Sequence, residues 1–324
     1  MKKLLAFSLL VISFTACRKT ISYIGTDPGN NGGTNGGNTG GAGGNTSGSL
    51  LIKALSINRK NDTVVILYDY DANGKVSSYS QKGKDDTITY NVSTKVIRNS
   101  TGSVLEVDQQ SMFTAMFPSL GGSSTTFDPA TLAALGINLD SLGMSQIIVH
   151  YPSGSTNFDY TTSSMNMMGI ATMTTTTNYT YTNGKITKST VYTSMSMSGV
   201  VMQPPTLSSM SEYIFNSAGD LITSKNYVAT GTGSTVKLAQ TNNYTYSDKP
   251  NPMYFGNEGL LLGNELNMSV HMSIQTVSSS INIGNVNGTI SNIVYNNNNL
   301  PICASQNINT MNGLGTYKLF MYYK

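Results

Sequence analysis

Few residues of this sequence have the types and the spacing that catalysis or metal binding requires. The chain holds two histidines, His150 and His271, and two cysteines, Cys17 and Cys303, all far apart. A zinc site needs several such ligands at short spacings, and a general base needs a nucleophile beside it. No Gly-x-Ser-x-Gly turn occurs either. We therefore expect no catalytic residue, no metal and no cofactor, and we predict that the protein is not an enzyme.

The local sequence around each of the two histidines favours a structural position over a catalytic one. His150 stands beside Tyr151, which favours a hydrogen-bonded core residue. His271 lies in the stretch 268–274, where apolar and polar residues alternate. That period of two assigns His271 to the polar face of a strand.

One acidic stretch resembles half of a calcium loop. Asp69-x-Asp71-x-Asn73-Gly74 has the first ligands of an EF-hand, but the twelfth position, where a bidentate Glu is needed, is Ser80. The flanking residues alternate as strands do. We expect a plain hairpin turn here, with calcium binding as the alternative.

Methionine is the unusual feature of the composition, with 17 residues. Many of them crowd the middle of the chain, and Met side chains suit adaptable apolar binding surfaces. Two interpretations are open: filling of the core under a curved sheet, or a face that binds an acyl chain or another apolar molecule. The residues of this Met-rich face are Met165, Met167, Met168, Met173, Met195 and Met197.

A hairpin unit recurs along the chain and organises the fold. Its best copy runs Tyr68-Asp69-Tyr70-Asp71-Ala72-Asn73-Gly74-Lys75-Val76, and looser copies begin at Tyr179, Tyr213 and Tyr244. Two aromatic residues of one strand precede a short turn that in most copies contains Gly, which permits the positive φ of a tight hairpin. Both rings of each pair lie on one face, where cross-strand packing and stacking on a sugar ring are the two uses.

The fold class that follows is all-β. We expect an antiparallel meander of hairpins over residues 50–324, forming one domain as a twisted open sheet or a half-barrel. Residues 111–144 interrupt the strand pattern: Pro118 stops one helical turn, and Asp128-Pro129 starts another. We predict a small helical insert there. A further apolar stretch near 259–266 is expected to be a short helix or a covering loop.

The N-terminus has the pattern of an exported chain. Met1-Lys2-Lys3 precedes a short apolar run, too short to span a bilayer. Small residues then precede Cys17, so residues 1–16 are predicted to be a signal peptide that is removed. Residues 17–49 begin with that cysteine and continue as a Gly/Asn-rich tether. With Cys17 acylated, we expect the chain to form no disulfide bond.

This arrangement resembles two known groups of proteins. The segment around Cys17 resembles the lipobox of bacterial lipoproteins, in which the cysteine is acylated by a lipid such as palmitate. Tyr68–Val76 resembles the YD-type hairpin of Rhs-like proteins. The lipobox, the tether, the hairpins and Lys249-Pro250-Asn251-Pro252 together resemble lipoproteins of Bacteroidota. The resemblance implies anchoring to the outer membrane, in either of its leaflets, and it brings no established catalytic residues.

The function that we predict is a non-catalytic, lipid-anchored module of the cell envelope, with a binding or structural role. The alternatives are a carrier of apolar molecules that uses the Met-rich face, and a glycan-binding accessory protein. The formal net charge is only +3, and no basic face indicates a nucleic-acid partner. The expected partners are therefore the membrane, through the lipid, and an apolar small molecule or a glycan.

Overall fold

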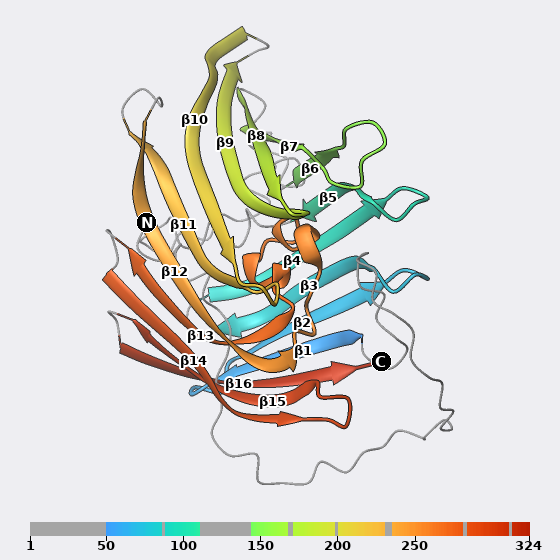
Figure 1. The fold of residues 1–324 in the computed structure, drawn as a ribbon, viewed down its shortest axis with the longest axis vertical. Coiled ribbons are helices and arrows are strands. Elements are labelled where there is room, and N and C mark those ends of the chain that lie inside the picture. The colour runs from blue at the N-terminus through green and yellow to red at the C-terminus, as the bar shows by residue number, and fades with distance from the viewer. Residues whose placement is uncertain are drawn as a thin grey trace, which may run out of the picture.

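The structure is a computed structural model, and it describes residues 50–85, 88–110, 144–167, 171–197, 200–230, 235–280, 284–310 and 313–324. These residues form a closed antiparallel barrel of 16 strands (Figure 1). The strands are β1 (Leu51–Asn58), β2 (Thr63–Tyr70), β3 (Val76–Asp85), β4 (Ile88–Arg98), β5 (Val104–Gln110), β6 (Met144–His150), β7 (Tyr160–Met167), β8 (Ala171–Thr182), β9 (Lys185–Met197), β10 (Val200–Phe215), β11 (Leu221–Thr230), β12 (Thr235–Pro250), β13 (His271–Ser280), β14 (Gly284–Tyr295), β15 (Pro301–Thr310) and β16 (Gly313–Tyr323).

The all-β antiparallel prediction is confirmed, but the open sheet or half-barrel is wrong. Every strand pairs with its neighbours in sequence, as a meander must, and β16 then pairs with β1. That last ladder sets Leu55 opposite Phe320 and Ser56 opposite Leu319. Local sequence patterns report adjacent hairpins only, so the closing pair, formed by the two extremes of the barrel, is invisible to them. Closure removes both sheet edges.

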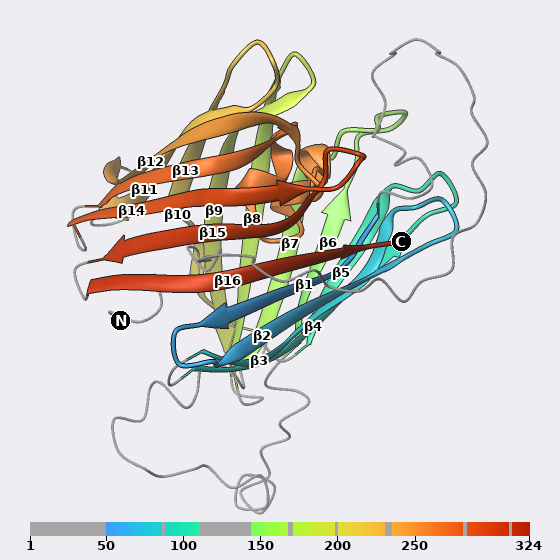
Figure 2. The same ribbon diagram turned by 90° about the horizontal axis from the view of Figure 1, so that it is seen from below.

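The barrel has two distinct ends because the strands alternate in direction. Leu50 and Lys324 meet at one end, where the Lys324 N–H donates to the Leu50 carbonyl at 3.0 Å. Here the even strands finish and the next odd strands begin, and we call it the capped end. At the far end β7 finishes, β8 begins, and β9 passes to β10 (Figure 2).

Four turns at the capped end share one construction, and two of them, 71–75 and 216–220, belong to copies of the recurring hairpin unit. They span residues 71–75, 99–103, 216–220 and 296–300. In each, the first residue is Asp or Asn and exchanges backbone hydrogen bonds with the fourth and fifth residues. Its side-chain oxygen also accepts one or two backbone N–H groups of the turn. The fourth residue has positive φ: Gly74, Gly102, Gly219 and Asn299, a conformation that Gly and Asn tolerate best.

Tyrosines near the ends of even strands reinforce this end. The Tyr70 hydroxyl donates to the Leu51 carbonyl at 2.7 Å, and Tyr246 donates to Leu221 at 2.6 Å. Each bond runs back to the start of the preceding strand. The same bond joins Tyr151 to Val104, Tyr181 to Phe158, and Tyr323 to Pro301. The second ring of an aromatic pair therefore ties two strands together.

Residues 251–270, between β12 and β13, lie inside the ring of strands (Figures 1 and 2). We call this segment the plug. It contains two short 3-10 helices, η2 (Gly256–Leu260) and η3 (Glu265–Met268), so the predicted short helix or covering loop is confirmed. Leu261, Leu262 and Met268 of the plug are buried in the larger apolar core cluster, against strand starts such as Val76 and Leu221.

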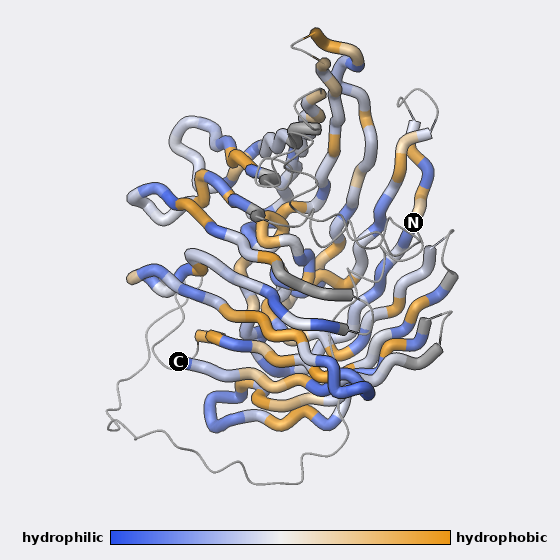
Figure 3. The backbone as a smooth tube through the Cα atoms, turned by 180° about the vertical axis from the view of Figure 1, so that it is seen from behind, coloured by the Kyte–Doolittle hydropathy of each residue, from blue (hydrophilic) through white to orange (hydrophobic). Residues whose placement is uncertain are grey.

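Hydropathy alternates along the strands (Figure 3), and the core lies on the inner face. Tyr79, for example, donates its hydroxyl to the Leu262 carbonyl of the plug at 3.3 Å. Tyr79 is the register partner of Tyr68, whose hydroxyl contacts Met253 Sδ at 3.4 Å. Cross-strand partners share a face, so the register carries this inward assignment from strand to strand around the barrel.

Three further features of the fold concern residues 111–144, the two prolines of β10 and Cys303. The helical insert at 111–144 lies outside the described residues except for Met144, which begins β6. Pro204 and Pro205 lie within β10, and register shifts on both sides of Gln203 accommodate these residues, which have no backbone N–H. Cys303 is buried on β15. Among the described residues, no helix is long and apolar enough to cross a membrane.

Candidate functional site

The Met-rich positions come together on three adjacent strands. The register places Met165, Met173 and Met195 in one row across β7, β8 and β9. Met167, Ala171 and Met197 form the next row toward the far end. Five of the six predicted positions therefore lie in two neighbouring rows, and we call these rows the Met patch. Met168 lies outside the described residues.

The Met patch belongs to the inner wall. Tyr179 lies on the same face of β8 as Met173, and its hydroxyl is 3.3 Å from that of Thr161 on β7. Its ring packs edge-on against the buried Phe158 at 4.9 Å between centroids. The ladder between β8 and β9 shifts register only beyond Thr180, so the face does not change between Tyr179 and the patch.

Burial at the patch is partial. Met173 and Met195 are half-buried, and Met197 is 41 % exposed. Between the patch and the tyrosines the inner wall of β8 carries Thr175 and Thr177. The patch is therefore an apolar band near the far end, separate from the apolar core around the plug. The crowding of Met residues in the middle of the chain was the signal for this patch.

A second, polar part of the inner wall could not be found from the sequence. Glu265 of η3 accepts a hydrogen bond from Ser224 Oγ at 2.7 Å and another from the Tyr244 hydroxyl. Asn242 Nδ2 donates to the same oxygen at 3.3 Å. These residues come from the plug, β11 and β12, far apart in sequence and without a shared motif. Burial, followed by the nearby Glu265 carboxylate, raises the pKa of Tyr244 well above its usual value.

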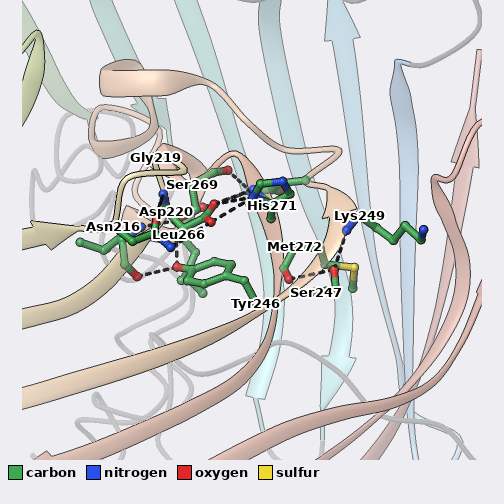
Figure 4. A network of polar contacts seen from close by, with 12 residues as sticks. Asn216, Gly219, Asp220, Tyr246, Ser247, Lys249, Leu266, Ser269, His271 and Met272 are labelled. Carbon is green, nitrogen blue, oxygen red and sulfur yellow. Dashed lines mark hydrogen bonds and ion pairs between the residues drawn. The ribbon is translucent and has the colours of Figure 1, made fainter.

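An Asp–His pair fastens the end of the plug (Figure 4). Asp220 is almost fully buried and accepts from the His271 backbone N–H at 2.8 Å and lies 3.0 Å from its Nδ1. Ser269 is close by, but its hydroxyl accepts from Leu221 N and contacts Tyr246. His271 is thus held by a buried carboxylate, which corrects its assignment to a loosely bonded surface position. The pair joins the plug to the 216–220 turn.

The remaining candidates serve the barrel wall. His150 stacks on Tyr160 at 4.1 Å and contacts Thr162 Oγ1 at 3.1 Å. Asp71 caps its own turn, whereas Asp69 accepts from Ser78 on the neighbouring strand at 2.7 Å. The two carboxylates have separate partners, and the plain hairpin is confirmed. No cluster of three or more His, Cys, Asp or Glu side chains that could hold a metal occurs within the described ranges.

The paired tyrosines have their rings inside the barrel. The hydroxyls of Tyr68, Tyr179 and Tyr244 contact the plug or the inner wall, while those of Tyr70, Tyr181 and Tyr246 bond to strand carbonyls. Cross-strand and plug packing therefore accounts for these pairs. They do not form an outer platform on which a sugar ring could stack.

No protein-family model matches the chain, and no curated protein matches it either. Among solved structures, the chain is similar to a porin-like protein from Bacteroides vulgatus ATCC 8482, with 12 % identity and a TM-score of 0.46 over 85 % of this chain and 99 % of the other. It is also similar to a porin-like protein from Bacteroides uniformis ATCC 8492, with 9 % identity and a TM-score of 0.42 over 86 % and 98 % of the two chains. Likenesses of this size concern the fold alone.

Proposed function

We propose that this protein is a non-catalytic, lipid-anchored barrel of the cell envelope that binds an apolar molecule at the Met patch. The observation that carries the binding role is the register, which gathers Met positions of three strands into two adjacent rows, in which Met173 and Met195 belong to the inner wall. Met side chains adapt to ligands of varied shape. The plug fills the barrel at the capped end, so a ligand would enter from the far end.

The residues on the outer wall support the inference that the barrel is surrounded by water and not by lipid. On β8 the outward positions are Thr172, Thr174, Thr176, Asn178 and Thr180, alternating with the inward Met173 and Tyr179. They cover about 26 Å of strand, at roughly 3.3 Å per residue. A barrel that spans a bilayer needs an outward apolar band about 25 Å tall. This strand has none over that length.

Charged residues strengthen this inference. Glu212 on β10 lies next to the inward Tyr213 and therefore faces outward, opposite Lys188 on β9 and Lys225 on β11. A lysine facing lipid near the centre of a bilayer costs about 2–4 kcal/mol. Outward positions on β12 to β14 are also polar, including Thr241, Asn243 and Asn287. We infer that the membrane contact is made by the acylated Cys17 and not by the wall.

Location can be tested with the Cys17→Ala variant. It should lose metabolic labelling by palmitate and should leave the membrane pellet upon carbonate extraction, because the wall itself does not enter the bilayer. The matched control is Cys303→Ala, which should keep both the label and the pellet location. Retention of Cys17→Ala in the extracted pellet, or a disulfide between Cys17 and Cys303 seen on a non-reducing gel, would contradict the lipid anchor.

Binding can be tested with full-length Cys17→Ala, which permits purification without detergent. The probe is the neutral fluorophore N-phenyl-1-naphthylamine. Adding Met173→Asp should weaken its binding about 10-fold or more, since contact with one apolar side chain contributes roughly 1.5–3 kcal/mol. Thr174→Asp, one residue away on the outward face, is the control and should leave the Kd unchanged. Equal loss in both variants, or no binding by the parent, would refute the Met patch as the site.

A further inference from the structure

The two glutamates of the plug have different electrostatic environments. Glu258 is paired with Arg98, whose Nη1 lies 2.9 Å from its Oε2. Glu265 receives hydrogen bonds from Ser224, Asn242 and Tyr244, all neutral groups. The ion pairs within the described ranges involve Glu258, Asp248 and Asp220 and leave Glu265 without a basic partner. Glu265 is also only partly buried.

The neutral donors around Glu265 are fixed in place by the wall. Ser224 and Asn242 are register partners on β11 and β12, and Asn242 Nδ2 also donates to Ser224 Oγ at 3.0 Å. Ser224, Asn242 and Tyr244 are all buried. All three donate to Oε1 of Glu265, so these contacts hold the carboxylate in one orientation without neutralising it.

A second acceptor lies on the inner wall at β15. Gln306 on β15 is 6 % exposed, and its Oε1 is buried without a hydrogen-bond partner among the described residues. Its Nε2 lies over Gly288, 3.6 Å from where a Cβ would stand. Gly288 continues the row that begins at Tyr244 and passes through Thr276. A buried acceptor without a donor is costly.

Glu265 is thus a carboxylate on the inner side of the barrel without a cationic partner among the described residues. A primary ammonium group fits it, because it has three N–H donors, no acceptor and a positive charge. An alcohol would supply one donor and no charge. A carboxylate would be repelled by Glu265.

The position of this region relative to the Met patch suggests what the ammonium is attached to. Tyr179 is the first ring of its aromatic pair on β8, as Tyr244 is on β12, and both lie just inside the capped end. From Tyr179 to Met173 the strand extends about 20 Å, at roughly 3.3 Å per residue. A group seated at Glu265 therefore needs a long apolar chain to reach the Met patch.

We propose that Glu265 binds the primary ammonium head of a long-chain amphiphile whose apolar chain extends toward the Met patch. This inference rests on the proposed function for the chain contacts, while the head-group contacts stand on Glu265 alone. The class of ligand is an alkyl or acyl chain that carries a protonated amine.

The test compares three amphiphiles of equal chain length, dodecylamine, dodecanol and dodecanoate, by isothermal titration calorimetry on full-length Cys17→Ala. Dodecylamine should bind at least 10-fold more tightly than dodecanol, and dodecanoate should bind most weakly. Glu265→Gln keeps an acceptor for Ser224 and Tyr244, so it should fold; a thermal unfolding scan checks this. It should remove the preference for the amine while leaving N-phenyl-1-naphthylamine binding unchanged.

The matched control is Glu212→Gln, which removes an outward carboxylate that accepts from the Tyr227 hydroxyl at 2.8 Å. It should leave the preference intact. A preference that persists in folded Glu265→Gln, or equal binding of all three amphiphiles, would overturn the head-group site. Loss of fluorophore binding alone, with an amine preference that depends on Glu265, would instead refute the Met patch and keep this inference.

Discussion

The capped end and the far end of the barrel differ in how far their apolar side chains are exposed to solvent. At the capped end the first residues of the strands are sealed: Val76, Val104 and Leu221 are at most 2 % exposed. At the far end the start of β10 is open to solvent, with Val200 and Val201 each 64 % exposed. The same type of side chain is thus core at one end and surface at the other.

The cause of the difference is the plug and the bonds that hold it. Plug residues bond to β3, β4, β9, β11 and β12, and His271, directly after the plug, bonds to the 216–220 turn. The contacts therefore reach strands from different sides of the ring. Stability should be concentrated where these contacts are, whereas the wall beyond them is free to carry a ligand-binding face. Substitutions at the two ends test this division directly.

The largest effect is expected at Arg98. Its guanidinium donates to the Val76 and Gly102 carbonyls as well as to Glu258, and its side chain is 8 % exposed. Arg98→Met keeps the apolar stem but leaves the Glu258 carboxylate without its cation and removes a donor from the Val76 and Gly102 carbonyls, of which Gly102 keeps Lys75 Nζ. Breaking such a buried pair costs about 3–5 kcal/mol, measured as the free energy of unfolding in urea.

The control for Arg98 is the same substitution at the other end. Arg59 is exposed in the link from β1 to β2 at the far end, and Arg59→Met should change the unfolding free energy by no more than about 0.5 kcal/mol. Similar losses in the two variants would show that the capped end does not dominate stability.

A smaller effect is expected from Gly259→Ala in η2. A Cβ at Gly259 would lie 2.8 Å from the Asn267 backbone carbon and 3.0 Å from Met268 N, so η2 and η3 would be pushed apart. Overpacking of this kind costs about 1–3 kcal/mol. Gly288→Ala on β14 is the control, because its Cβ would meet nothing closer than 3.6 Å. Binding of N-phenyl-1-naphthylamine should survive in both variants, since the Met patch is remote from η2.

The sequence was informative about what is local and uninformative about what is distant. Alternation and Asn or Gly turns predicted the strands and hairpins, because each depends on residues a few positions apart. The crowding of Met residues in the middle of the chain suggested one Met-rich face, as the alternative to core filling. The register across β7, β8 and β9 supplies the rows in which five of these positions stand.

Closure and the polar site at Glu265 had no local signal. The ladder between β1 and β16 joins the two extremes of the barrel, so its hydrogen bonds leave no pattern in either strand. Glu265 is an ordinary residue until the fold brings Ser224 and Tyr244 to it. Gln306 likewise becomes notable only because its oxygen is buried without a donor. Such sites depend on packing between distant segments, which periodicity cannot report.

The smallest expected effect is on the pH dependence of the unfolding free energy, which should change on removing the hydroxyl of the buried Tyr213 but not that of the exposed Tyr322. Burial, with the Glu265 charge adding to it and the bond to Ser189 opposing it, raises the pKa of Tyr213 to about 12. In the unfolded chain a tyrosine ionises near pH 10. The folded state therefore holds the proton more tightly, and the associated stability is complete below pH 10 and is lost as the pH rises from 10 toward 12.

Between pH 8 and pH 11 the wild type should lose about 1 kcal/mol more unfolding free energy than Tyr213→Phe, measured in guanidinium chloride. Tyr322→Phe, at an exposed ring on the outer wall, should follow the wild type at every pH. If the unfolding free energy of Tyr213→Phe instead falls with pH in parallel with that of the wild type, burial does not raise the pKa of Tyr213. The description of the capped half as sealed then loses this support.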